Sequence, residues 1–229
     1  DALPIYEGCI LGYFTVWQGP ENNVCDSLNI QKRNEVLIGW SKDGFHWNRE
    51  NKKPFLPVSE DFHAWNAGNV QSTAGSPLIV GDSLYFYVSG RYNSKPKHDS
   101  NFATGLAMLR RDGFVSMRAG RKEGYIEIKT QIPANGNYLF VNADVKGTLA
   151  VEVLDDNGQP MEGFTKKDCI SMKKSDKTKQ MISWEKHPGV TSLVGKTVRL
   201  KFYLNQADIY AFWISAWQTG ESGGYTGGG

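Results

Sequence analysis

The sequence predicts an all-β protein made of two parts that follow one another along the chain. Aromatic residues make up 12% of the chain and there are 25 glycines, a composition that favours strands and tight turns over helices. β-branched and aromatic residues occur in short runs separated by Gly, Asp, Asn and Pro. Asp-Gly lies between two such runs at Asp43-Gly44 and again at Asp112-Gly113, and this dipeptide is a strong signal for a β-hairpin.

The first part, residues 1–120, contains two similar units. Each unit reads as an inner strand, an aromatic strand, a loop, a third strand, an Asp-Gly turn and a short outer strand. The aromatic strands lie in residues 5–19 and 84–90, and the outer strands follow the two Asp-Gly turns. Four strands in a repeated unit are typical of propeller blades, so we expect about two β-propeller blades in residues 1–120.

The second part, residues 121–217, has short strands separated by turns at regular intervals, which predicts a β-sandwich. The turn residues 205–208 are expected to join its last two strands as a hairpin. Residues 218–229 are rich in Gly, and we expect this tail to have no fold of its own. The expected strands are 125–132, 138–145, 148–154, 169–172, 179–184, 197–204 and 209–215.

Composition and motifs exclude several classes of function. The net charge of +2 gives no electrostatic case for nucleic acid. No apolar run is long enough to span a membrane, and no hydrolase triad motif is present. No nucleotide-binding loop is present either, and we expect no cofactor. The three cysteines form no Cys-x-x-Cys motif and suggest no metal site. Cys9 and Cys25 are expected either to pair or to stay as free thiols.

Two stretches carry a resemblance to a known family. Residues 85–91, Y-F-Y-V-S-G-R after the Gly81-Asp82 turn, and residues 41–47, S-K-D-G-F-H-W, resemble blades of the five-bladed propeller glycoside hydrolases of families 43 and 32. The second stretch is also similar to the sialidase Asp-box, one residue shorter before the Gly. The second part resembles the β-sandwich appended to such propellers, at residues 149–154, 156–160, 163–164, 198–200 and 209–212.

The resemblance implies a glycosidase, or the C-terminal fragment of one, that acts on a glycan outside the cytoplasm, in an extracellular or periplasmic location. Five blades need more chain than residues 1–120 provide. Either N-terminal blades precede this sequence in a longer product, or a partner chain completes the propeller.

The candidate catalytic residues are two glutamates. In the family, a Glu followed by Gly opens a blade and serves as the general acid, and this role falls on Glu7. Glycosidic cleavage needs a second carboxylate, and Glu35 opens the strand that leads to the first Asp-Gly turn. The structural alternatives are an exposed edge residue for Glu7 and a surface strand start for Glu35. Asp43 and Asp112 are interpreted as scaffold, because turn aspartates bond to the backbone.

The candidate sugar-binding residues are amides, indoles and arginines near strand ends. Planar amides bind sugar hydroxyls and aromatic faces bind the C–H surface of the ring, whereas capping of blade turns is the structural alternative. The alternative functions are a non-catalytic carbohydrate-binding protein or a structural β module. The number of carboxylates in the pocket discriminates between hydrolysis and binding, because hydrolysis needs at least two and a lone Glu7 among amides and aromatics favours binding. The candidate binding residues are Trp17, Gln18, Arg33, Trp65, Asn66, Asn69, Gln71 and Arg91.

Overall fold

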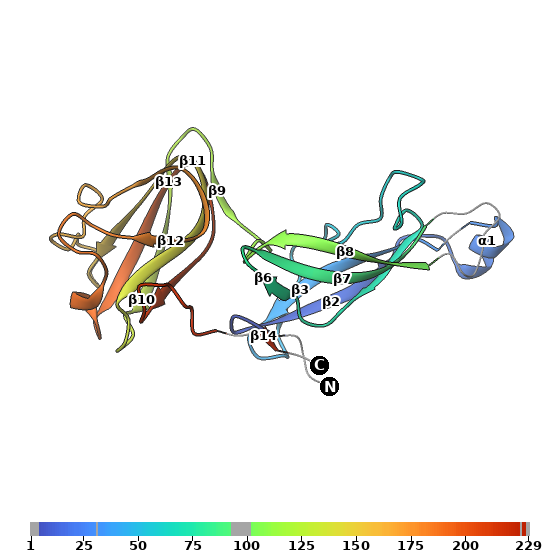
Figure 1. Cartoon of the computed structure of the whole chain (residues 1–229), viewed down its shortest axis with the longest axis horizontal. Helices are drawn as coiled ribbons and strands as arrows, with labels where there is room; N and C mark the ends of the chain where they lie inside the picture. The colour runs from blue at the N-terminus through green and yellow to red at the C-terminus, as the bar shows by residue number, and fades with distance from the viewer. Residues whose placement is uncertain (1–4, 31, 93–101, 225, 228–229) are drawn as a thin grey trace. The chain divides into compact units, whose positions relative to one another are not determined.

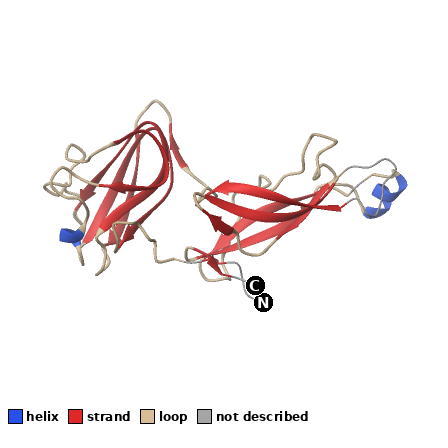
Figure 2. Ribbon diagram, in the orientation of Figure 1, coloured by secondary structure: helices blue, strands red, loops and turns tan. Residues whose placement is uncertain are grey.

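The computed structural model describes residues 5–30, 32–92, 102–224 and 226–227, and over these residues the protein is all-β. The chain forms two compact units, each built from curved sheets (Figures 1 and 2). Unit 1 comprises residues 1–109 together with 224–229, and unit 2 comprises residues 110–223. The division therefore falls at residue 110 and not at 121, and the end of the chain returns to the first unit.

The first sheet of unit 1, called sheet A, has the strand order β14-β1-β2-β3-β4. Strands β2 and β3 pair along their whole length, from Ile10 opposite Ser41 to Trp17 opposite Asn34. A six-residue helix, α1, follows β2 at this second end. The elements are β1 (Ile5–Tyr6), β2 (Cys9–Trp17), α1 (Asn22–Ser27), β3 (Asn34–Ser41), β4 (Trp47–Asn48) and β14 (Thr226–Gly227).

The second sheet of unit 1, called sheet B, is centred on β7. This strand alternates buried Leu84, Phe86 and Val88 with more exposed residues, the pattern of a strand with one face in a core. The two sheets pack through aromatic rings, since Tyr13 of β2 meets Phe86 edge-on at 5.9 Å between ring centroids. The strands are β5 (Asn69–Thr73), β6 (Leu78–Val80), β7 (Ser83–Arg91) and β8 (Phe102–Arg110).

Unit 2 contains one strongly curved sheet of order β10-β13-β11-β12, with β9 also paired to β13. Its hydrophobic core includes the buried Trp184, whose indole N–H donates to Val151 O at 3.0 Å. The elements are β9 (Met117–Ala119), β10 (Gly124–Gln131), β11 (Tyr138–Leu154), β12 (Met172–Ile182), η1 (Thr191–Leu193) and β13 (Thr197–Ser215).

Two expected turns in unit 2 are bends within continuous strands. Residues 205–208 were expected to close a hairpin, yet β13 runs through them and stays paired to β11 on both sides. The register shifts between Val145 and Thr148 of β11, which marks a bulge, and Gln206 adopts a left-handed conformation with φ 43°. The prediction of separate strands was therefore wrong, because polar residues at a bulge look like turn residues in the sequence.

The second Asp-Gly site does not close a hairpin either. Strand β8 ends at Arg110, and the next strand, β9, pairs with β13 of unit 2. Asp112-Gly113 thus lies where the chain leaves unit 1 and begins unit 2, whereas Asp43-Gly44 does join the paired strands β3 and β4.

The Gly-rich tail is partly ordered, contrary to expectation. Ser215 Oγ donates to Glu221 O at 2.7 Å, the Trp213 indole donates to Gly220 O at 3.1 Å, and β14 pairs with β1. Residues 225, 228 and 229 of the tail and residues 93–101 of the loop after β7 lie outside the described residues. None of the helices in the described ranges is long and apolar enough to cross a membrane.

Candidate functional site

Glu7 lies in a turn and not in a strand. Tyr6 pairs with Cys9, so Glu7 and Gly8 are the two central residues of a hairpin between β1 and β2. Their φ angles of 50° and 84° are those of a type I′ turn. Glu7 therefore sits at the sharp end of a hairpin, at the start of β2.

Glu35 lies at the other end of the same strand pair. It is opposite Val16, whereas the Glu7 turn precedes Cys9. The seven residue steps from Cys9 to Val16 separate the two positions by about 23 Å along β2, at about 3.3 Å per residue. A glycosidase holds its two carboxyl groups about 5–9.5 Å apart. The structure therefore does not bring Glu7 and Glu35 together as a catalytic pair.

Glu35 is instead one of three charged groups in contact. Its carboxylate is buried, and it accepts the backbone N–H of Val58 at 3.3 Å. The Arg33 guanidinium nitrogen NH2 lies 3.6 Å from Glu35 Oε1 and 3.0 Å from Glu60 Oε1. Glu60 is exposed and comes from the irregular segment between β4 and β5, so one arginine links a buried carboxylate to an exposed one.

The two sheets of unit 1 bring a pair of carboxamides to the same end. Asn34 lies opposite Trp17, and cross-strand partners share a face, so Asn34 is on the face of sheet A that carries Tyr13 toward sheet B. Asn69 begins β5 of sheet B, and its Nδ2 donates to Lys32 O at 2.8 Å. Both residues are more than nine-tenths buried.

The side-chain oxygens of these two amides lack a donor. Neither Asn34 Oδ1 nor Asn69 Oδ1 has a hydrogen-bond partner within the described ranges, although both atoms are buried. The Tyr13 hydroxyl between the sheets is likewise buried without a hydrogen-bond partner among the described residues, and burial raises the pKa of this phenol. An unpaired buried polar group costs about 1–3 kcal/mol, so such groups usually meet water or a ligand.

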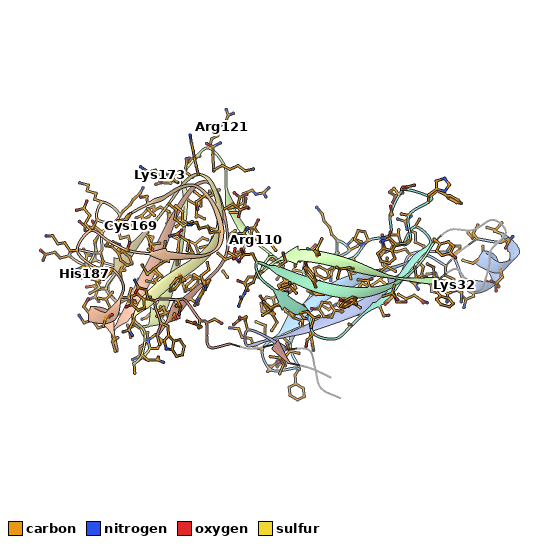
Figure 3. The ribbon with its side chains drawn as sticks, in the orientation of Figure 1. Lys32, Arg110, Arg121, Cys169, Lys173 and His187 are labelled. Carbon is orange, nitrogen blue, oxygen red and sulfur yellow. The ribbon has the colours of Figure 1, made fainter. Side chains whose placement is uncertain are left out.

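An indole stands beside the amides. Trp17 is 41% exposed, and its N–H donates to Gly19 O at 2.7 Å and Pro20 O at 2.9 Å, which holds the ring in place. The Lys32 ammonium lies 5.5 Å from the ring centroid, and Figure 3 places Lys32 at the end of unit 1 that carries α1. We call the group Trp17, Arg33, Asn34, Glu35, Glu60 and Asn69 the sheet-end cluster.

Most of the other predicted binding residues belong to this region. Gln18 N donates to Arg33 O at 2.8 Å, Asn66 Nδ2 donates to Pro57 O at 3.1 Å, and Arg91 pairs with Asn69 across β7 and β5. Gln71 is exposed, and its backbone carbonyl accepts from Thr15.

Trp65 has a packing role. A Cβ at Gly90 would come 2.6 Å from its ring, which therefore lies flat against β7.

Sequence reasoning missed Asn34 and Glu60. Asn34 had a usable signal, because Arg33, Asn34 and Glu35 are three polar residues that open an otherwise apolar strand. Glu60 had none, since nothing in the irregular segment 51–64 predicts a contact with Arg33. Cys9 and Cys25 are free thiols. Cys9 begins β2 and Cys25 lies in α1, which follows the other end of that strand.

Unit 2 offers no comparable group of unpaired side chains. On the polar face of its sheet, Glu152 accepts from the Tyr203 hydroxyl at 2.7 Å, and burial together with this carboxylate raises the pKa of Tyr203 to about 12.

Cys169 and His187, which Figure 3 labels in this unit, also make packing contacts. Cys169 Sγ accepts from Val151 N at 3.2 Å and burial raises the pKa of its thiol, while His187 stacks on Phe164. No group of three His, Cys, Asp or Glu side chains within the described part of the chain could hold a metal ion. Comparisons of the chain with protein families, curated proteins and solved structures find no match.

Proposed function

We propose that this protein binds carbohydrate through the sheet-end cluster. The observation that carries the proposal is the pair of buried, unpaired oxygens of Asn34 and Asn69. Sugar hydroxyls are donors that would satisfy these oxygens, and the exposed face of Trp17 suits the C–H surface of a pyranose ring. Arg33 and Glu60, whose side chains are exposed, add charged partners for further hydroxyls.

The proposal predicts that Asn34 is retained for binding at a cost in stability. Replacing Asn34 by Leu removes an unpaired buried oxygen and keeps the branched shape of the side chain, so Asn34→Leu should raise the free energy of unfolding by about 1 kcal/mol. The same change should abolish binding. If Asn34 only supported the fold, replacing it would not raise stability and abolish glycan binding at the same time.

The test is retention of the labelled protein on an array of plant, algal and animal glycans, followed by calorimetry with the glycan retained best. Wild type and Asn157→Leu, a change in an exposed turn of unit 2, should bind alike, whereas Asn34→Leu should not bind. Absence of any retained glycan, or equal retention of Asn34→Leu, contradicts the proposal.

Glycoside hydrolysis is the second candidate, and one observation favours it. Glu35 and Glu60 lie 3.6 and 3.0 Å from the same Arg33 nitrogen, so these two oxygens are at most about 6.6 Å apart, a limit that overlaps the lower part of the range of about 5–9.5 Å that glycosidases use. In this mechanism Glu60, which is exposed, would meet the substrate first. Glu35→Gln and Glu60→Gln should then abolish the release of reducing ends from oligosaccharides, and Glu7→Gln should not. Loss of turnover in Glu7→Gln alone would contradict this assignment.

The proposed architecture follows the same interpretation. We infer that the two packed sheets of unit 1 correspond to neighbouring propeller blades and that unit 2 corresponds to a β-sandwich. Support comes from the outer face of sheet B, where Leu78, Tyr87, Phe102, Leu106 and Met108 are exposed apolar side chains. Further blades, from a longer chain or from a partner chain, would cover this face. An extracellular or periplasmic location accompanies a glycan-binding role.

A further inference from the structure

A hollow lies at the opposite end of sheet A from the sheet-end cluster. It surrounds the turn between β3 and β4, and its volume of about 330 Å³ is at the small end of ligand sites. It is shallow and open to solvent. The lining residues are Trp40, Lys42, Asp43, His46, Trp47 and Asn48.

Two tryptophans line this hollow. Trp40 is 41% exposed and Trp47 is 36% exposed, so both side chains leave surface open to solvent. Trp47 is held in place, because its N–H donates to Gly44 O at 3.0 Å and its ring lies over Gly12. A Cβ at Gly12 would come 2.6 Å from that ring, so this glycine provides the space that the indole occupies.

The charges in the hollow leave one cation available. The Asp43 carboxylate accepts from the backbone N–H groups of Phe45 and His46 at 2.9 and 2.8 Å, and it meets His46 Nδ1 at 2.6 Å. It is thus committed to its own turn. Lys42 is exposed and makes no ion pair with any of the described residues. Asn48 accepts from Glu50 N through Oδ1, which leaves its Nδ2 to donate.

We propose that this hollow binds an acidic sugar residue of a glycan. The ring of the sugar lies against the indoles, its carboxylate pairs with the Lys42 ammonium, and a hydroxyl accepts from Asn48 Nδ2. The site is separate from the sheet-end cluster, since Trp40 and Asn34 stand at opposite ends of β3. It adds a preference for negative charge that the sheet-end cluster, with its two carboxylates, does not have.

The test is calorimetry with three probes: trigalacturonate, the neutral galactotriose of the same length, and citrate as an anion without a sugar ring. Wild type should bind trigalacturonate most tightly, and Lys42→Gln should weaken that binding about tenfold without affecting the neutral probe. Trp40→Ala should weaken the binding of both sugars by a similar factor, and Trp40→Phe should keep part of the affinity that Trp40→Ala loses. Lys52→Gln, another exposed lysine, is the matched control.

The outcomes distinguish this site from the proposed function. Lys42→Gln should leave the retention of neutral glycans unchanged, because Lys42 lies outside the sheet-end cluster, whereas Asn34→Leu is expected to lose that retention. Equal affinity of Lys42→Gln and wild type for trigalacturonate overturns the proposal, as does absence of binding by wild type. Binding of citrate as tight as that of trigalacturonate reduces the hollow to an anion patch and overturns the assignment to a sugar.

Discussion

The two Asp-Gly turns begin from the same dipeptide and are built differently. In the first turn the left-handed residue is Gly44 with φ 79°. The Asp43 carboxylate accepts hydrogen bonds from the backbone N–H groups of Phe45 and His46. In the second turn the left-handed residue is Asp112 itself, with φ 57°. Its carboxylate accepts from Asn142 Nδ2 at 3.1 Å, a group that lies 30 residues further along the chain.

The difference shows what a local motif can determine. The first turn is stabilised within itself, so the strands on both sides of it pair with each other. The second turn is stabilised from outside. Buried Asn142 of β11 donates to Arg111 O at 2.6 Å and accepts from Arg110 Nε at 2.7 Å, and these contacts commit the chain to unit 2. The strand that follows therefore pairs with β13.

Replacement of Asn142, which holds the second turn, is expected to cause the largest loss of stability. Asn142→Ala leaves the partly buried Arg111 carbonyl and the Arg110 guanidinium without their amide partner, which should cost about 2–4 kcal/mol in unit 2. Hydrogen exchange followed by mass spectrometry should show lower protection of β11 and β13 and unchanged protection of β2 and β3. Asn157→Ala, in an exposed turn, is the control and should leave both regions protected. Equal loss in both units would contradict a role confined to the second turn.

Loss of Asp43 should destabilise unit 1 alone. Asp43→Ala removes two backbone hydrogen bonds and the contact with His46, so the β3–β4 hairpin should open more readily. We expect a smaller effect than for Asn142, because the groups released are exposed and can bond to water. The measurement is exchange in the segment 40–48 compared with β11. Asp61→Ala, which removes a single backbone bond to His63, should have a weaker effect.

The first turn should also make unit 1 sensitive to acid. Backbone hydrogen bonds from His46 are the main cause that lowers the pKa of Asp43, followed by the His46 side chain. A carboxyl whose folded-state pKa is depressed stabilises the fold above its unfolded pKa of about 3.9, and this contribution is lost as the pH falls through the folded value. Denaturation midpoints of unit 1 at pH 5 and pH 2.5 should therefore differ more for wild type than for Asp43→Asn. An identical difference in the two proteins would contradict this origin.

The sequence was sufficient for what local chemistry determines. It predicted the all-β class, the β3–β4 hairpin and the scaffold role of Asp43, each from propensities or turn residues that act within a few positions. It also collected Trp17, Arg33, Glu35 and Asn69 into one candidate site. It failed for the bent strands β11 and β13, whose bulge residues look like turns, and for the second Asp-Gly site, where Asn142 decides the outcome.

The prediction that Glu7 lies in a strand beside a second carboxylate was wrong for a related reason. A Glu before a Gly can belong to a strand or to a type I′ turn, and the sequence does not distinguish the two. The pairing of Tyr6 with Cys9 does, and it depends on how β1 meets β2 and β14. Glu60 could not be found because its contact with Arg33 joins a strand to an irregular segment. In each case the missing information lies in contacts between elements.

The smallest expected effect comes from giving both turns the same residue. Asp112→Gly relieves the left-handed conformation of a residue with a side chain, which favours Gly, and removes the bond from Asn142, so the two changes should nearly cancel and leave unit 2 within about 0.5 kcal/mol of wild type. Asp43→Gly gains nothing of this kind, because Gly44 already supplies the left-handed position, and it loses every bond of the carboxylate. Denaturation followed separately in the two units measures both variants. A large loss for Asp112→Gly would mean that Asp112, and not Asn142, holds the second turn.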